Sequence, residues 1–387
     1  MLLLATKVWE QRKLLKVCKK EDNKRIPIKE QERKEGNTPY FGANGIQGYI
    51  DGYTHDGTNI LIAEDGANNV KNYPIKLITG KIWVNNHAHV LNVNTKTNNG
   101  NFLVGAIKKI NFYRYLVGSS RYKLTAESLS QVKIEITEQS EQEKIGELFK
   151  SIEELLTLYE RKLKLLSQVK KYFLDNLFTE KEYPNLRFKG FTDAWEQRQL
   201  GEIGTTYSGL SGKNKSDFEK GNSNFVTFLE VLNNPILKNI DLTNKVEIKE
   251  NEHQNKVKRN DILFNTSSET PEEVATSTVV DVNQSNLYLN SFCFGFRPNV
   301  KFSNYYIGYY LRSNHFRNRV FCLAQGISRY NISKKSLIKL KLSLPKLEEQ
   351  DKIGKIFNQV ELLLTLYENK KQNLIEIKKS LLNTMFI

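Results

Sequence analysis

The 387-residue chain contains one segment twice. Residues 141–178 match residues 349–386 at a constant offset of 208, without a gap, and 19 of the 38 positions are identical. The same offset relates Ser120-Arg121-Tyr122 to Ser328-Arg329-Tyr330. A second match, at offset 186, joins Trp9-Glu10-Gln11-Arg12 to Trp195-Glu196-Gln197-Arg198. Because repetition on this scale means that one structural unit is built twice, the chain is a tandem duplication.

The sequences between these repeated edges do not align, and they differ in length by 22 residues, the difference between the two offsets. The pattern favours a shared scaffold that carries two diverged recognition surfaces. The alternative is ordinary loop divergence, which affects any duplicated two-domain protein.

Apolar residues recur at alternating steps of four and three in both 38-residue copies. They are Ile145, Phe149, Ile152, Leu156, Tyr159, Leu163, Leu166, Phe173 and Leu177, and then Ile353, Phe357, Val360, Leu364, Tyr367, Leu374, Leu381 and Met385. This heptad spacing predicts two long helices that pack along a continuous seam. At 1.5 Å per residue each helix is about 55–60 Å long.

The two helices are expected to pair with each other, antiparallel, because both copies carry the same seam. The alternative is that each helix lies flat against its own domain. Leu155, Leu363, Ile375 and Ile377 widen the apolar stripe beyond a two-helix seam, which indicates a further packing partner. Leu155 and Leu363 are candidate contacts for such a partner, together with the seam residues Tyr159 and Tyr367.

The net charge of +15 lies entirely outside the repeated helices. Residues 1–140 carry a net +8 and residues 179–347 a net +7, whereas both helices are neutral. Two similarly basic bodies suit a nucleic acid first and an anionic membrane surface second. Cys18, Cys293 and Cys322 have no metal-binding or C-x-x-C spacing, which favours free thiols in a reducing compartment. The absence of a signal-peptide core or an apolar run of membrane-spanning length predicts a soluble, cytoplasmic protein.

Two phrases at the edges of the second half resemble a known family. The half opens with Pro184-Asn185-Leu186-Arg187-Phe188, Phe191-Thr192-Asp193-Ala194-Trp195-Glu196 and Leu200-Gly201-Glu202-Ile203, and it closes with Leu342-Ser343-Leu344-Pro345-Lys346-Leu347-Glu348-Glu349-Gln350. The first phrase is similar to the domain opening, and the second to the domain exit, of specificity subunits of type I restriction-modification systems. The resemblance to this family covers nearly the whole chain. The first half departs from the pattern, since it begins almost directly at Trp9 and has Ile134-Glu135-Ile136-Thr137 at its exit.

The resemblance implies an α+β fold in which two α/β target recognition domains, residues 1–140 and 184–346, are joined by two long antiparallel coiled-coil helices. Those helices lie in residues 141–183, which include a linker, and in residues 347–387. The family reads a bipartite target in double-stranded DNA and assembles with two methyltransferase (modification) subunits and with restriction subunits. S-adenosylmethionine, ATP and Mg²⁺ are then expected in the partners, and no cofactor, metal or catalytic residue in this chain. Because the two middles differ, the half-sites are expected to differ, so that the target is asymmetric.

Glycine-rich and basic loops supply the candidate DNA contacts. Asn44 and Gln47, in the turn Gly42–Gly48, could pair with adenine edges, although a plain hairpin with polar tips explains the turn equally well. Lys213 and Lys215 lie in a loop that fails the phosphate-loop pattern, and they are candidate phosphate contacts or simple solvated surface.

The duplicated Arg121-Tyr122 and Arg329-Tyr330 follow small, flexible residues, and they precede short helices expected at 125–129 and 333–337, the second capped by Ser333. They are candidate DNA contacts, or structural residues that tie the loop to the helix. Tyr305–Arg319 is expected to form an amphipathic core helix, whose basic edge could touch the DNA backbone.

Two enzyme readings find little support. Asn37-Thr38-Pro39-Tyr40 resembles the catalytic tetrapeptide of amino-methyltransferases but lacks the proline at its second position, and no cofactor loop accompanies it. His87 and His89 lie on one face of a strand, at a spacing that could hold a metal, but a hydrogen-bonded or DNA-facing pair is favoured. The rival functions are a self-contained DNA methyltransferase or nuclease, and a coiled-coil scaffold that binds RNA or protein.

Overall fold

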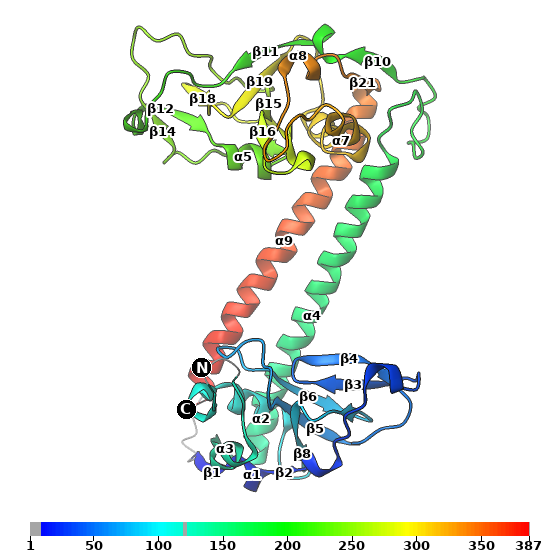
Figure 1. Ribbon diagram of the computed structural model, residues 1–387, viewed down its shortest axis with the longest axis vertical. Helices are drawn as coiled ribbons and strands as arrows, with labels where there is room; N and C mark the ends of the chain where they lie inside the picture. Colours follow the sequence, from blue (N-terminus) through cyan, green and yellow to red (C-terminus); the bar gives the residue numbers. More distant parts are fainter. Residues whose placement is uncertain (1–8, 119–121, 387) are drawn as a thin grey trace. The chain divides into compact units, whose positions relative to one another are not determined.

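The computed structural model describes residues 9–118 and 122–386 (Figure 1). The chain divides into two compact units, of which unit 1 combines residues 1–161 with residues 368–387 and unit 2 spans residues 162–367. Each unit has its own hydrophobic cores. No described helix is long and apolar enough to cross a membrane.

Unit 1 is built on a four-stranded sheet with the order β2-β8-β5-β6, next to a three-stranded sheet with the order β4-β3-β7 and a β1-β9 pair. The strands are β1 Glu10–Lys13, β2 Cys18–Lys20, β3 Thr38–Gly42, β4 Gly45–Ile50, β5 Thr58–Ala63, β6 Ile75–Thr79, β7 Trp83–Val84, β8 Ala88–Val93 and β9 Lys133–Ile136. The short helices are α1 Leu14–Val17, α2 Gly100–Lys108 and α3 Ala126–Gln131. Apolar side chains of α2 pack with those of β5 and β8 in the main core.

Unit 2 has a different sheet, of five strands in the order β11-β19-β15-β17-β13, together with β14-β12-β18, β16-β20 and β10-β21. The strands are β10 Glu196–Gln199, β11 Gly204–Ser208, β12 Phe218–Val226, β13 Ile236–Leu237, β14 Lys245–Val246, β15 Ile262–Asn265, β16 Ser267–Ser268, β17 Ser277–Val280, β18 Leu287–Leu289, β19 Cys293–Pro298, β20 Tyr330–Asn331 and β21 Lys341–Leu344. The short helices are α5 Phe228–Asn233, α6 Asn304–Tyr310, α7 Asn314–Phe321 and α8 Lys334–Leu337.

The two long helices predicted from the heptads are confirmed as α4 (Gln139–Asn176) and α9 (Leu347–Met385). The first part of α4 and the last part of α9 belong to unit 1, and the last part of α4 and the first part of α9 belong to unit 2. Within each unit the two helix segments run side by side (Figure 1). The seam residues from Ile145 to Leu177 and from Ile353 to Met385 are buried or half-buried, while most of the residues between them are exposed. Spacing of 3.5 residues therefore sets which face of each helix is covered.

Polar contacts across the seam show that the segments are antiparallel in both units. In unit 1, Lys378 Nζ lies 2.5 Å from Glu153 Oε1, and Lys371 Nζ lies 3.7 Å from Glu160 Oε1. In unit 2, Lys170 Nζ lies 2.7 Å from Glu361 Oε2, and Lys162 Nζ lies 4.9 Å from the centre of the Tyr367 ring. Lys170, Lys371 and Lys378 stand at heptad positions where the apolar pattern is interrupted, and each reaches an acid of the other helix.

The repeated edges of the sequence form the same scaffold in both units. The pair β1-β9 joins Glu10 to Ile136, and β10-β21 joins Glu196 to Leu344 in the corresponding register. Thr125 caps α3 by accepting a hydrogen bond from the Ser128 N–H. Ser333 caps α8 in the same way, as predicted. The capping hydroxyls satisfy backbone N–H groups that a helix start leaves free.

Each unit also buries a phenylalanine from the end of one repeated segment. Phe386, 2% exposed, contacts the rings of Trp9, Phe102 and Phe149 in unit 1. Its counterpart at offset 208, Phe178, is fully buried in unit 2 and stacks on Phe357 with ring centroids 5.3 Å apart. Unit 1 thus depends on the residue that directly follows α9, and unit 2 on the second residue after the end of α4.

Candidate nucleic-acid and partner interfaces

The glycine-rich hairpin of unit 1 has the predicted form, because β3 and β4 flank its turn with antiparallel pairing. Both sides of the Asn44 amide are used inside the protein, since Nδ2 donates to the Gly66 carbonyl and Oδ1 accepts from the Asn68 N–H. Gln47 Oε1 accepts from Asn85 Nδ2 at 3.2 Å. Asn44 is thereby held as a loop anchor, whereas Gln47 keeps an amide nitrogen for which no partner is found among the described residues.

The loop of unit 2 that contains Lys213 and Lys215 separates the two lysines. The Lys213 side chain is buried, its ammonium donates to the Glu247 carbonyl at 2.6 Å, and it forms an ion pair with Glu252. In this geometry the Lys213 ammonium is already bound within the chain, so a phosphate contact would require it to leave these partners. Lys215, at the start of a short 3₁₀ turn, remains exposed.

Arg329 lies in an exposed loop of unit 2 whose base is fixed. Gln325 and Asn331 exchange two backbone hydrogen bonds of 2.9 and 2.8 Å, and Tyr330 belongs to β20, which pairs with β16. Gly326 has a φ of +141°, and a Cβ there would lie 2.0 Å from the Arg329 carbonyl oxygen, so the turn requires glycine. The loop holds the Arg329 backbone in place while its guanidinium faces solvent.

The two members of the first duplicated pair have different outcomes. Arg121 lies outside the described residues. Tyr122 is half-buried and packs edge-on against Tyr113, with ring centroids 5.7 Å apart. Tyr330 likewise is half-buried and packs against the main core of unit 2. In both units the tyrosine thus serves at least the packing of the loop.

The expected single helix over Tyr305–Arg319 is wrong. The chain forms α6 and α7, with a turn between them at Ser313, whose backbone is extended. The Arg312 guanidinium donates to the carbonyls of Ser277, Val231 and Asn234 at 2.8–3.0 Å. Burial lowers the pKa of Arg312 to about 10.

Arg317 is held in the same manner, by the carbonyls of Glu272 and Val274. Burial lowers its pKa to about 10 as well. The expected basic edge therefore does not face solvent at Arg312 and Arg317. Both side chains are buried and bind backbone carbonyls of unit 2.

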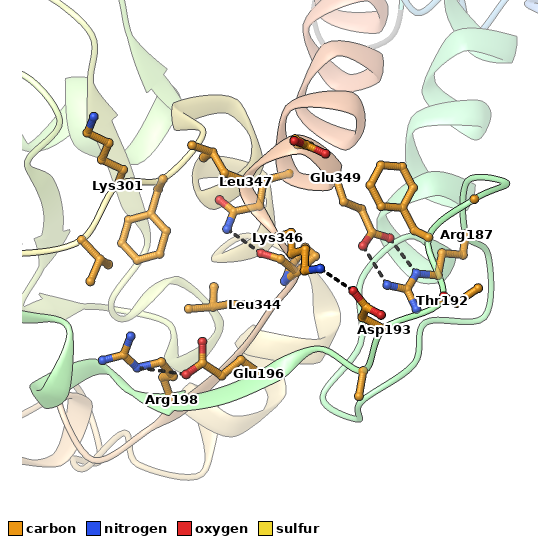
Figure 2. A pocket seen from close by; sticks show the side chains of 18 residues that line it. Arg187, Thr192, Asp193, Glu196, Arg198, Lys301, Leu344, Lys346, Leu347 and Glu349 are labelled. Carbon is orange, nitrogen blue, oxygen red and sulfur yellow. Dashed lines mark hydrogen bonds and ion pairs between the residues drawn. The ribbon is translucent and has the colours of Figure 1, made fainter.

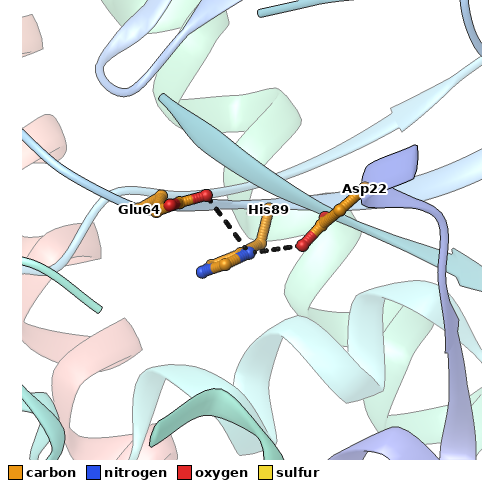
Figure 3. Close-up of side chains that lie close together, drawn as sticks. All are labelled: Asp22, Glu64 and His89. Atoms are coloured by element: carbon orange, nitrogen blue, oxygen red, sulfur yellow. Dashed lines mark hydrogen bonds and ion pairs between the residues drawn. The ribbon is translucent and has the colours of Figure 1, made fainter. Parts of the chain in front are cut away.

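His89, Asp22 and Glu64 place their ligand atoms within 4.8 Å of one another in unit 1 (Figure 3). His89 is fully buried, its Nδ1 is hydrogen-bonded to Asp22 Oδ2 at 2.7 Å, and its Nε2 to the Leu124 carbonyl at 2.8 Å. Both ring nitrogens are engaged, so neither offers a lone pair to a metal ion.

The carboxylates of this cluster are also neutralised by cations. Arg25 Nη1 lies 2.7 Å from Glu64 Oε2, and Lys123 Nζ lies 3.1 Å from Glu64 Oε1. Burial raises the pKa of Glu64, but hydrogen bonds from Arg25 and Lys123 lower it by more. The pKa of Glu64 therefore lies below its usual value. The cluster is best described as a charge network that ties β8 to the segments around Asp22, Glu64 and Lys123. His87 forms a separate pair with Asp65.

The candidate partner contacts on the helices fall into two classes. Tyr159 and Tyr367 are half-buried in the seam, and Lys162 Nζ lies 4.9 Å from the centre of the Tyr367 ring. Leu155 and Leu363 are exposed on the flank of the seam. The leucines therefore leave apolar surface that this chain does not cover, whereas the tyrosines pack in the seam between the two helices.

Sequence reasoning missed some exposed apolar residues near the candidate DNA surfaces. Ile327 is 96% exposed beside Arg329, and Tyr53 is exposed with Lys81 Nζ 4.7 Å from the centre of its ring. Tyr49 is exposed on β4. Alternation of side chains along the strand Gly45–Ile50 could have indicated Tyr49, but nothing in the sequence distinguishes Ile327 from a core residue.

Known proteins place the chain in a family. A family model described as the type I restriction modification DNA specificity domain matches residues 6–168 and 192–377. A putative type I restriction enzyme specificity subunit of Haemophilus influenzae is 44% identical over 131 residues, which cover 34% of each chain. A putative MjaX specificity subunit of Methanocaldococcus jannaschii is 24% identical over 304 residues, 73% of this chain and 66% of the relative. The match thus covers about a third of the length of the Haemophilus relative and just under two thirds of that of the Methanocaldococcus relative.

Solved structures show the same fold. The S subunit of a type I restriction-modification system from M. genitalium superposes with a TM-score of 0.67 at 16% identity, over 100% of this chain and 98% of that one. A chain from a structure of type I R-M complex assembly and conformational transition gives a TM-score of 0.51 at 16% identity, over 97% and 96%. Since the family model matches most of both halves, the chain belongs to the type I restriction modification DNA specificity domain family and carries that domain twice.

Proposed function

We propose that this protein is the subunit that recognises a split DNA sequence, with each unit reading one half-site in double-stranded DNA, and that it directs methyltransferase and restriction subunits to that target. The observation that carries the proposal is the combination of one repeated scaffold with two different interiors. Unit 1 centres on a four-stranded sheet and unit 2 on a five-stranded sheet, while the positive charge is divided almost equally between residues 1–140 and 179–347. Similar charge supports similar binding of the DNA phosphates by the two units. Different interiors support the recognition of different bases.

The half-sites are therefore proposed to be unequal, and the helices to set the gap between them. Local differences support unequal reading. Arg329, on a loop fixed at its base, has an identical counterpart in Arg121, but the exposed Ile327 beside it is replaced by a serine, residue 119, in the first repeat. An arginine on such a loop can bind the O6 and N7 edge of a guanine.

The partner surface is supported by exposed leucines that are identical in both repeats. Leu155 and Leu363 are 42% and 39% exposed, and Leu158 and Leu366 are 43% and 45% exposed. Packing within each unit does not demand an exposed leucine, so a contact outside the chain explains why both repeats keep it. Since the same residues occur twice, the proposed partner binds in two copies, which fits two methyltransferase subunits.

The chemistry is proposed to belong to the partners. S-adenosylmethionine is then bound by the methyltransferase subunits, and ATP and Mg²⁺ serve the restriction subunits. The role of this chain is non-catalytic, and consists of holding two recognition surfaces and docking the enzymes. Incubation of the isolated chain with DNA and labelled S-adenosylmethionine tests this division, because methyl transfer by the chain alone would contradict it.

Selection from random DNA with the assembled complex tests the function itself. Two different short motifs separated by a fixed number of base pairs are expected. One contiguous motif, or a perfect palindrome, would contradict the proposal. Competition between duplex DNA and RNA at several salt concentrations distinguishes a DNA-recognition subunit from a scaffold that binds RNA or protein. Sequence-specific DNA binding combines a steep salt dependence with a preference for the selected duplex, which a scaffold would not show.

A further inference from the structure

Each unit contains a cavity at the start of its long helix. In unit 2 a cavity of about 490 Å³ lies between β10, the exit of β21 and the first turn of α9 (Figure 2). In unit 1 a cavity of about 700 Å³ lies between β1, the exit of β9 and the first turn of α4. We call these two cavities the sockets.

The sockets are equivalent under the duplication. With offset 186 for the strand and 208 for the helix, seven lining positions correspond, and three of them are identical. The pairs are Glu10/Glu196, Arg12/Arg198, Ile136/Leu344, Thr137/Pro345, Glu138/Lys346, Gln139/Leu347 and Gln142/Gln350. The backbone around both sockets is also alike, because β1-β9 and β10-β21 share one register.

One of the identical pairs is explained by the fold. Gln142 Nε2 donates to the Thr137 carbonyl, while its Oε1 accepts from the Asn99 N–H. Gln350 makes the same two bonds, to the Pro345 carbonyl and from the Ser303 N–H. This glutamine ties the start of the long helix to the loop before it and to the start of a neighbouring helix, so its identity in both repeats is structural.

The other two identical pairs are not explained by the fold. The Glu10 and Arg12 side chains are 60% and 55% exposed, and those of Glu196 and Arg198 are 70% and 33% exposed. Within each strand the two residues form an ion pair, of 2.6 Å in unit 1 and 3.7 Å in unit 2. Such a solvent-accessible ion pair contributes little to the stability of the fold, because water screens the attraction between its charges. The interiors of the units have diverged beyond alignment, so folding alone does not account for the identity of these two pairs, in which Glu10, Arg12 and Glu196 are exposed and Arg198 is half-buried.

The charge of the sockets indicates a protein and not a nucleic acid. Among the described lining residues of unit 1, two acids, Glu10 and Glu138, face two bases, Arg12 and Lys16. In unit 2 four acids accompany four bases: Asp193, Glu196, Glu348 and Glu349, with Arg187, Arg198, Lys301 and Lys346. A polyanion gains affinity from net positive charge, which both linings lack. A polypeptide with charges of both signs is complementary to such a surface.

We propose that the two sockets receive the same protein partner in two copies, each copy presenting a basic side chain to Glu10 or Glu196 and an acidic side chain to Arg12 or Arg198. The proposal rests on the proposed function, in which the partner present in two copies is the methyltransferase subunit. The sockets are a docking surface separate from the exposed leucines, because they lie at the first turn of each long helix and the leucines lie some four turns further along.

Exchange of the two charges tests the sockets without removing the ion pair in the strand. The variants are E10R/R12E in unit 1 and E196R/R198E in unit 2. Each exchange is expected to weaken binding of one methyltransferase copy by at least tenfold, so that native mass spectrometry of the chain with its cognate methyltransferase subunit shows one copy in place of two. Both exchanges together are expected to remove both copies.

Matched controls lie on the same strands. Lys13→Glu and Gln199→Glu change the charge at equivalent positions that differ between the repeats and point to the opposite face from Arg12 and Arg198. Both controls are expected to keep two copies. Unchanged binding by the exchanged variants would overturn the sockets alone, and so would a loss of DNA binding with both copies retained. A wild-type chain that binds no methyltransferase subunit would overturn the proposed function, and the sockets with it.

Discussion

His89 bridges two separate parts of unit 1, because its Nδ1 lies 2.7 Å from Asp22 Oδ2 and its Nε2 lies 2.8 Å from the carbonyl oxygen of Leu124. Removal of this ring leaves a carboxylate and a carbonyl without their donor in a buried place. His89→Ala is therefore expected to destabilise unit 1 by about 3 kcal/mol. Urea unfolding followed by the fluorescence of Trp9 and Trp83 measures the effect. His87→Ala, at a partly exposed position, is the control, and an equal loss from both variants would contradict a special role for His89.

The same network makes the stability of unit 1 dependent on pH. Burial raises the pKa of Asp22, but hydrogen bonds from His89 and from the Val90 N–H lower it by more, and the pKa of Glu64 is also below its usual value. Carboxyls with a lowered pKa in the folded state stabilise it fully above their unfolded values, near 3.9 and 4.3, and lose that contribution as the pH falls through the lower folded values. The free energy of unfolding is therefore expected to decrease as the pH falls from about 5 to 3. An Asp22→Asn/Glu64→Gln variant should be less stable at pH 7 and have a shallower slope, and a parallel slope would refute the assignment.

Charges at the exposed leucines should weaken partner assembly and leave the recognition units folded. Leu155→Glu and Leu363→Glu each place a carboxylate on apolar surface that a partner would cover, and a loss of affinity of about tenfold or more is expected for one methyltransferase copy. Copurification and native mass spectrometry measure it, with thermal unfolding as the check on folding. Leu165→Glu is the matched control, since Leu165 is exposed on the same helix but is replaced by Asn373 in the other repeat. Full assembly by both variants would count against this surface.

Arg329 and Lys213 should respond in opposite ways to truncation. Arg329→Ala removes an exposed guanidinium, and the expected result is unchanged thermal stability with DNA binding weaker by about 1–3 kcal/mol at the second half-site. Lys213→Met breaks a buried ion pair and a hydrogen bond to the Glu247 carbonyl, so a lower melting temperature is expected. Fluorescence anisotropy with the selected target and differential scanning calorimetry separate the two effects. A destabilised Arg329→Ala chain would assign that arginine to the loop structure.

The long helices could be predicted from the sequence because their evidence is local and occurs twice. A fixed offset of 208 and a repeat of 3.5 residues define length, buried face and pairing together, and α4 and α9 follow that definition. The Ser333 cap was predictable for the same reason, since the hydroxyl acts on an N–H only three residues away.

The buried arginines could not be predicted, because their partners are distant in the sequence. Arg312 binds carbonyls of Ser277, Val231 and Asn234, which come from two other segments of the chain. A basic and aromatic stretch looks the same whether such carbonyls surround it or solvent does. The break between α6 and α7 could not be predicted either, because neither a proline nor a glycine stands next to Ser313 to indicate it.

The burial of Phe386 in unit 1 bears on how the protein is made. Synthesis delivers Trp9, Phe102 and Phe149 early, yet the ring that fills the space among them is made only after the whole of unit 2, residues 162–367. A message cut short before residue 386 would yield a first unit with an open, water-exposed aromatic patch, a target for proteases and chaperones. Folding of unit 1 is thereby coupled to the synthesis of unit 2, and a fragment that ends before residue 386 is expected to be unstable.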